Sequence, residues 1–309
     1  MKIKKINLVK DNPEVTLTTY LLADSPEMLA GKARPAIIIC PGGGYFNCSD
    51  REAEPVAMYF ASQGYHAFVL RYSTYQTGEL TMPDLSKPLP VKEASLYPRQ
   101  IRELGLAMLL IKQNASDWHV DPDQVGVCGF SAGGNVAALY ATCYNEAVLT
   151  DYFQVAAQQL RPAFAITGYA LTDYHLLDRD LAKQTSDMGA AFMRASNVAY
   201  LGKEIPDYEL EAAVSPVDHV DSQTPPFFIW TTATDQLVSA VHSLNLASAL
   251  AEANIPYEIH VFGEGEHGLS LASQATSQVK SQIKPAVSEW THLCAKWLTK
   301  RFPLNLAEK

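Results

Sequence analysis

The chain has few charged residues and lacks the clusters and runs that mark several classes of protein. Charged residues make up 18% of its 309 residues, whereas soluble domains average about 25%. The net charge is −9, and basic residues cluster nowhere beyond Lys2, Lys4 and Lys5. Because nucleic acids and anionic membranes are bound mainly through lysine and arginine, neither is an expected partner. No uncharged apolar run reaches the length of about 18 residues that a membrane-spanning helix needs.

Cysteine pairs, a leader segment and cofactor motifs are also missing. The five cysteines are odd in number and widely spaced, which predicts reduced, mostly buried thiols in a cytoplasmic protein. Polar residues and Pro13 interrupt the N-terminal segment before an apolar stretch develops, so no signal peptide is expected. No histidine, cysteine and aspartate cluster has metal-ligand spacing, and no Walker or dinucleotide glycine pattern occurs. The sequence therefore predicts neither a metal nor another cofactor.

Apolar residues are abundant, at 48% of the chain, and they fall into short runs that alternate with helical patterns. The runs that predict strands are 15–22, 36–40, 66–70, 125–128, 164–168, 227–231 and 257–262. The stretches that predict helices are 52–63, the residues from Arg99 onward, 135–143, 238–251 and a terminal helix with Ile283, Val287, Trp290, Cys294 and Trp297 on its apolar face. This alternation predicts an α/β fold with a mostly parallel central sheet and helices on both faces.

The chain shows no repeat, low-complexity tract or linker, so a single domain over 1–309 is expected. Residues 72–97 carry several prolines and predict a long surface excursion, a feature that is usually functional in a compact domain. Residues 169–220 lack clean periodicity and predict an insertion, or cap, over the active-site edge of the sheet. In parallel sheets that edge is formed by the carboxyl ends of the strands.

The most informative motif is Gly-Phe-Ser-Ala-Gly-Gly at 129–134, between the run at 125–128 and the helical stretch that begins at Asn135. A Gly-x-Ser-x-Gly in this setting is typical of a nucleophile elbow, a sharp turn from strand to helix that exposes a serine hydroxyl. The pattern arises by chance in a fair share of chains of this length, so its position between strand and helix carries the argument. It predicts Ser131 as a nucleophile.

A serine hydroxyl needs a base to take its proton and an acid to orient that base. His267 follows the last predicted strand in a loop with three glycines, which allows its ring to reach the elbow. Asp235 follows the strand at 227–231, so we predict that it is the acid that orients His267. Its alternative role is to cap the next helix. The order Ser131, Asp235, His267 is the order of α/β-hydrolases. The competing carboxylates are Glu264, Glu266, Asp218 and Asp221.

The loop Pro-Gly-Gly-Gly-Tyr at 41–45 follows a buried strand upstream of the elbow. Glycines let backbone N–H groups approach a negative oxygen, and each such donor stabilises a tetrahedral intermediate by about 3 kcal/mol. We expect Gly43, Gly44 and Ala132 to form this oxyanion hole. Cys40 and Cys128 are rival nucleophiles. Both lie in apolar runs without a positively charged neighbour that would favour a thiolate, so we predict that they are buried structural thiols.

With these motifs the chain resembles the esterase and lipase family of α/β-hydrolases, and within it the branch of acetyl-xylan and feruloyl esterase-like carbohydrate esterases. The resemblance covers nearly the whole chain, with 41–45, 68–72, the elbow and 262–272 as its strongest segments. It implies the same triad, an oxyanion hole from the triglycine loop, and short-chain acyl esters as substrates. Pro41 stands where lipase relatives often have a histidine, so the loop departs from the lipase pattern at this position.

The function expected from these residues is that of a serine carboxylester hydrolase acting on acetyl groups of small sugars or oligosaccharides. Tyr45, Tyr72 and Tyr169 are candidate substrate-binding residues, because tyrosine offers carbohydrate both a ring face and a hydroxyl. The alternatives are an amidase, such as an arylformamidase or a small serine peptidase with the same triad, and a ligand-binding protein without catalysis. The sequence does not specify acyl chain length, the alcohol half of the ester or a homo-oligomer.

Overall fold

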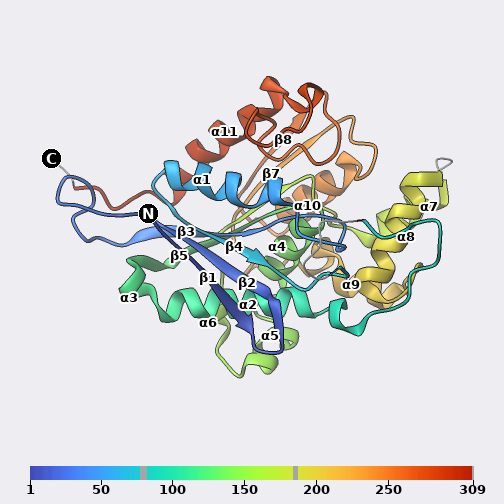
Figure 1. The fold of residues 1–309 in the computed structure, drawn as a ribbon, viewed down its shortest axis with the longest axis horizontal. Helices are drawn as coiled ribbons and strands as arrows, with labels where there is room; N and C mark the ends of the chain where they lie inside the picture. The colour runs from blue at the N-terminus through green and yellow to red at the C-terminus, as the bar shows by residue number, and fades with distance from the viewer. Residues whose placement is uncertain (77–81, 184–186, 308–309) are drawn as a thin grey trace.

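The computed structural model describes residues 1–76, 82–183 and 187–307 and arranges them around a twisted eight-stranded sheet (Figure 1). The strand order is β1-β2-β4-β3-β5-β6-β7-β8, and β2 is antiparallel to both of its neighbours while the other strands are parallel. The strands are β1 (Lys2–Val9), β2 (Asn12–Leu21), β3 (Arg34–Cys40), β4 (His66–Arg71), β5 (Val120–Phe130), β6 (Ala165–Gly168), β7 (Phe227–Thr232) and β8 (Tyr257–Phe262). The predicted α/β architecture is confirmed.

Helices cover the sheet on both faces (Figure 1). The helices are α1 (Glu54–Ser62), α2 (Arg99–Gln113), α3 (Ala115–Trp118), α4 (Ser131–Cys143), α5 (Ala147–Phe153), α6 (Ala157–Leu160), α7 (Tyr174–Lys183), α8 (Asp187–Leu201), α9 (Tyr208–Val214), α10 (Ala240–Glu252) and α11 (Pro285–Arg301). Four short 3-10 turns join them within the described residues: η1 (Asp50–Glu52), η2 (Glu93–Ser95), η3 (Pro216–His219) and η4 (Lys280–Gln282). No described helix is long and apolar enough to cross a membrane.

Alternate residues of the central strands feed two hydrophobic clusters, one on each face of the sheet. Ile37 and Ile39 of β3 pack with residues of α1 and α11, among them Phe60 and Trp290. The side chain between them, Ile38, joins the other cluster, which α2, α4 and α10 cover. Both sets are fully buried, as strands covered on two faces require. The sheet is thereby held rigid, and the loops at its carboxyl edge are built on fixed strand ends.

Some predicted boundaries were wrong. Strand β1 was missed because most of its residues are exposed and it pairs only with β2 at the edge of the sheet. Ile283 lies before α11 and is 38% exposed, so it is not part of the apolar face of that helix. Strand β5 begins earlier than the predicted 125–128 and contains a bulge: β3 advances two residues, from Arg34 to Ala36, while β5 advances five.

The segment 169–220 is largely helical where it is described, with α7, α8 and α9 gathered at one end of the molecule (Figure 1). Helix α8 packs on the loop after β3: the rings of Tyr45 and Tyr200 stack with centroids 3.9 Å apart, and Phe46 meets Phe192 edge-on. Through these ring contacts the insertion touches the triglycine loop directly.

Residues 184–186 of the insertion, and residues 77–81 of the 72–97 excursion, lie outside the described residues.

Candidate active site

The turn from β5 into α4 holds Ser131 in the left-handed backbone region, with φ 51°. Non-glycine residues adopt this region at a cost, so the turn has to be imposed by its neighbours. A Cβ added to Gly129 would lie 2.1 Å from the Gly133 carbonyl oxygen, and one added to Gly133 would lie 2.2 Å from that of Cys40. Both distances are far below van der Waals contact, so the two glycines of the motif are needed for the chain to turn this sharply.

The structure brings Ser131, His267 and Asp235 together from the ends of β5, β8 and β7. His267 Nε2 lies 2.8 Å from Ser131 Oγ, and His267 Nδ1 lies 2.7 Å from Asp235 Oδ2. The two ring nitrogens therefore face a hydroxyl and a carboxylate in a continuous hydrogen-bonded row. This arrangement can move a proton from the serine to the histidine while the carboxylate stabilises the imidazolium that forms.

Asp235 is held in place by the turn that follows it. Its side chain is fully buried, and Oδ1 accepts hydrogen bonds from the N–H groups of Leu237 and Val238 at 2.9 and 3.0 Å. The sequence leaves two roles open for Asp235, orienting the histidine and capping the next helix; Oδ2 contacts the histidine, and Oδ1 binds the turn before α10 rather than the helix itself. Ser239, and not Asp235, is the residue that caps α10.

Three of the four rival carboxylates, all but Glu264, have other partners. Asp218 Oδ2 lies 3.1 Å from His175 Nε2, Asp221 Oδ1 accepts from the Thr224 backbone at 2.9 Å, and Glu266 pairs with Lys284 at 3.7 Å. No contact between any of these and His267 is found among the described residues.

The triglycine loop lies against the elbow. A Cβ on Gly42 would be 2.9 Å from Ser131 Cβ and 2.5 Å from the Phe130 carbonyl oxygen. Gly43 and Gly44 have φ 138° and 60°, a left-handed geometry that favours glycine. Within 1–76, 82–183 and 187–307, no group accepts a hydrogen bond from the N–H of Gly43 or Gly44. These donors are therefore free to bind an oxygen.

Ala132 supplies a further N–H at the start of α4. Ala132 is the second residue of α4, and the first N–H groups of a helix have no partner within the helix, so this donor can bind a ligand beside the elbow. The partial positive charge of a helix N-terminus adds to the attraction for an anion at this position.

One functional candidate was missed from the sequence: Glu52, in η1. Its side chain is buried, at 3% exposed, and its two oxygens accept from Gly42 N–H at 2.7 Å and from the Tyr169 hydroxyl at 2.6 Å. In the sequence Glu52 is an acidic residue at the start of a predicted helix, which is a common position for a carboxylate. Its short distance in sequence from the triglycine loop could have indicated a contact with that loop, but its partner Tyr169 is 117 residues away.

The three candidate tyrosines are placed in the interior. Tyr45 has no exposed surface and donates to Asn135 Oδ1 at 2.6 Å, and Tyr72 is 3% exposed and donates to the Pro41 carbonyl at 2.6 Å. Tyr169 is 2% exposed, with its ring centroid 5.0 Å from that of His267. None of the three offers an exposed ring face to a ligand, so their contacts are with the loops that carry the site.

The five cysteines are buried and unpaired, as the sequence predicted. Burial is the main cause that raises the pKa of the thiols of Cys40 and Cys128 well above the ordinary value. A thiol that stays protonated is a poor nucleophile, so neither competes with Ser131.

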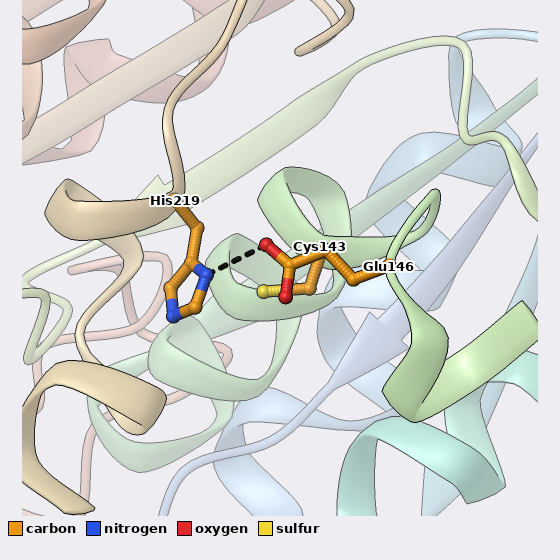
Figure 2. A group of neighbouring side chains, drawn as sticks. All are labelled: Cys143, Glu146 and His219. Atoms are coloured by element: carbon orange, nitrogen blue, oxygen red, sulfur yellow. Dashed lines mark hydrogen bonds and ion pairs between the residues drawn. The ribbon is translucent and has the colours of Figure 1, made fainter. Parts of the chain in front are cut away.

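A second group of potential ligands, Cys143, Glu146 and His219, lies away from the elbow at the far end of α4 (Figure 2). Nδ1 of the His219 ring is 2.7 Å from Glu146 Oε1, and Nε2 is 3.0 Å from the Ala212 carbonyl oxygen. Burial opposes the charged ring, but the hydrogen bond and charge of Glu146 outweigh it and raise the pKa of His219.

A metal at this group would have to break the ion pair and deprotonate Cys143, whose pKa is itself raised, first by burial. Metal ligation requires a thiolate and a neutral imidazole. The residues present fit an ion pair beside a neutral thiol, and we assign no metal to them.

Comparison with known proteins places these features in a family. A family profile described as BD-FAE matches residues 90–250, a stretch that holds Ser131 and Asp235. The acetylxylan esterase of Xylanibacter ruminicola is 25% identical over 275 residues, which are 87% of this chain and 47% of that protein. The chain spans between 33% and 56% of the length of the curated relatives that it matches.

Solved structures match over almost the whole chain. MGS-M1, an α/β-hydrolase enzyme from a Medee basin deep-sea metagenome library, is 32% identical with a TM-score of 0.71, covering 98% of this chain and 99% of that one. An acetyl ester-xyloside bifunctional hydrolase from Caldicellulosiruptor lactoaceticus is 28% identical with a TM-score of 0.70, covering 98% and 97%. The relatives thus share the fold throughout, including the segment that contains His267.

Proposed function

Because the chain belongs to the BD-FAE family of α/β-hydrolases, we propose that it is a serine carboxylester hydrolase that removes short acyl groups, above all acetyl, from small sugars or oligosaccharides. The observation that carries the proposal is the hydrogen-bonded row Asp235, His267, Ser131 at a strained elbow. The free N–H groups of Gly43, Gly44 and Ala132 beside it support an acyl-transfer reaction.

In the first half of the reaction, Ser131 Oγ attacks the ester carbonyl carbon and its proton passes to His267 Nε2. The carbonyl oxygen becomes an oxyanion, which the N–H groups of the triglycine loop and of Ala132 stabilise. The intermediate collapses with cleavage of the bond to the alcohol oxygen, and His267 returns its proton to that oxygen. The alcohol leaves and an acyl-serine remains.

In the second half, a water molecule attacks the acyl-serine as His267 takes one of its protons. A second oxyanion forms at the same donors and collapses to release the carboxylic acid. The proton returns from His267 to Ser131 Oγ, so the site is regenerated. Asp235 keeps its charge in both halves, because its role is to orient the ring and stabilise the imidazolium.

The substrate class rests on the relatives and on the charge of the chain. One relative is named as an acetylxylan esterase and one structural neighbour as an acetyl ester-xyloside hydrolase. The net charge of −9 and the lack of a basic cluster favour a neutral substrate over an anionic one. Acetylated neutral sugars are both acetyl esters and uncharged, so they agree with the relatives and with the charge of the chain.

The test is release of acid from a matched panel: acetylated xylo-oligosaccharides, monosaccharide acetates, nitrophenyl esters of increasing acyl length, a formyl-aryl amide and a peptide anilide. We expect the highest kcat/KM on acetyl esters and a fall with acyl length. A higher kcat/KM on either amide would assign the triad to an amidase. Absence of turnover on every ester would contradict the proposal and favour a ligand-binding role.

A further inference from the structure

We propose that Glu52 is a positioning residue that joins the triglycine loop at 41–45, called here the oxyanion loop, to the loop carrying His267. The inference rests on the proposed esterase reaction and concerns how its parts are held together. The loops come from the ends of β3 and β8, which are not neighbours in the sheet. The sheet fixes the two strand ends, but the loops that follow them extend beyond the paired residues, so the relative position of the loops depends on tertiary contacts.

The first link runs from Glu52 to the oxyanion loop. Glu52 Oε2 accepts from Gly42 N–H at 2.7 Å, and the Gly42 carbonyl accepts from Ser49 N–H at 2.8 Å. Both polar groups of Gly42 thus have partners within the protein. The next two N–H groups, of Gly43 and Gly44, have no acceptor among the described residues. The bond to Gly42 therefore leaves these two amides to bind the oxyanion.

The second link runs through Tyr169, at the end of β6. Its hydroxyl donates to Glu52 Oε1 at 2.6 Å and accepts from Ser270 N–H at 2.9 Å. Burial, and then the charge of Glu52, hold the pKa of this hydroxyl well above its ordinary value, so it remains a donor. Ser270 lies three residues after His267, and its carbonyl oxygen accepts from Trp290 Nε1 at 2.9 Å.

The same tyrosine contacts the catalytic histidine. The rings of Tyr169 and His267 meet edge to face, with centroids 5.0 Å apart and an interplanar angle of 69°. The phenol ring thereby supports the imidazole on one side while the hydroxyl holds its loop. Through Tyr169, a single carboxylate fixes both the N–H groups that bind the oxyanion and the ring that moves the proton.

A carboxylate suits this place because it accepts on both oxygens. A glutamine has one acceptor oxygen and one NH2 group. It can accept a hydrogen bond from Gly42 N–H or from the Tyr169 hydroxyl, but not from both. In a buried position the unmatched donor costs free energy, and the loop that carries it moves to find another partner. Catalysis is sensitive to a displacement of about 1 Å in such groups.

The experiment measures kcat and KM on nitrophenyl acetate for Glu52→Gln, Tyr169→Phe and the double variant. We expect Glu52→Gln to lower kcat by about 10- to 100-fold, less than the loss of an oxyanion donor itself, with KM within about threefold. Tyr169→Phe, which keeps the ring and the Gly42 bond, should lower kcat less. The double variant should be no slower than Glu52→Gln, because both act through one chain of contacts.

Glu103→Gln is the matched control. Glu103 is also buried, at 5% exposed, and also accepts from one backbone N–H and one hydroxyl, both of Ser73. Within the part of the chain that the structure describes, none of its hydrogen bonds goes to the triad or to the triglycine loop. We expect Glu103→Gln to lower the thermal midpoint at least as much as Glu52→Gln but to leave kcat within about threefold.

An unchanged kcat in Glu52→Gln would overturn the inference, as would an equal loss of kcat in Glu103→Gln. If Glu52→Gln does not fold, Tyr169→Phe decides, since a kcat equal to that of the unmodified protein would show that the tyrosine link does no positioning. Failure of the proposed function would give a different result. The unmodified protein would then hydrolyse no ester, or would hydrolyse it at a rate that Ser131→Ala does not change.

Discussion

At the scale of residues, Asp235 uses its two oxygens for different purposes. One binds His267 Nδ1 and the other accepts two backbone N–H groups, so the turn fixes the direction in which the carboxylate points. The histidine is consequently held with Nε2 toward Ser131 Oγ, 2.8 Å away. Replacement of the oxygen that faces His267 should damage catalysis without removing the turn.

Asp235→Asn is expected to lower kcat by about 10⁴-fold, as removal of the negative charge does in other serine triads. The amide can still accept from Leu237 and Val238, but toward His267 it presents an NH2 group, which favours the wrong tautomer of the ring. Steady-state turnover of nitrophenyl acetate measures the effect, and unchanged far-UV circular dichroism provides the control for folding. A kcat within tenfold of the unmodified protein would show that Asp235 is not the orienting acid.

How far single residues can be predicted from sequence depends on whether their neighbours in space are also neighbours in sequence. Ser131 and the glycines were predictable, since the turn that exposes the serine is a local feature. His267 and Asp235 were predictable because each follows a strand. Glu52 was not, because it acts through Tyr169, 117 residues further along the chain.

At the scale of elements, the β5–α4 elbow and the triglycine loop depend on each other. The backbone of β3 and its loop passes so close to Gly133 that a Cβ there would lie 2.2 Å from the Cys40 oxygen and 2.4 Å from that of Pro41. The glycine therefore lets the two elements touch at the point where Ser131 and the triglycine loop meet.

Gly133→Ala should destabilise the protein by about 1–3 kcal/mol through overpacking, and lower kcat by about 100-fold as the loop is pushed away from Ser131. The control is Gly263→Ala, because a Cβ there meets nothing within 4 Å. Urea unfolding and turnover measure the two effects. Equal values for the two variants would mean that the close approach at Gly133 has no role.

Central elements were predictable from sequence and peripheral ones were not. The buried strands are apolar throughout, so their runs stand out. Strand β1 is mostly exposed, and its place depends on pairing with β2 rather than on an apolar pattern of its own. Helix α8 was hidden in 169–220 because it buries aromatic residues against the triglycine loop, which blurs the usual amphipathic spacing.

At the scale of the whole molecule, burial of neutral histidines makes stability depend on pH. Burial is the main cause that lowers the pKa of His66 to about 4, and that of His242 to about 4. Below the ordinary value of 6.5 the unfolded chain binds protons that these folded residues refuse. The free energy of unfolding should therefore fall as the pH falls from 6.5 to 4. His219, with a raised pKa, acts in the opposite direction.

His66→Asn is expected to reduce this pH dependence by up to about 1.4 kcal/mol per pH unit between pH 6.5 and 4. Asparagine can keep the hydrogen bond that His66 Nδ1 accepts from Leu22 N–H at 3.0 Å, so the packing changes little. Urea unfolding at several pH values measures the slope. His292→Asn, at a side chain 69% exposed, should leave the slope unchanged, and an equal change in both variants would contradict the assignment.

The most direct test of the serine mechanism is the turnover of nitrophenyl acetate by the Ser131→Ala protein beside the unmodified one. We expect readily measured hydrolysis by the unmodified protein and a loss of about 10⁶-fold in kcat on replacement of Ser131, because the nucleophile and its base act as a unit. Hydrolysis by Ser131→Ala at the rate of the unmodified protein would show that the elbow serine is not the nucleophile.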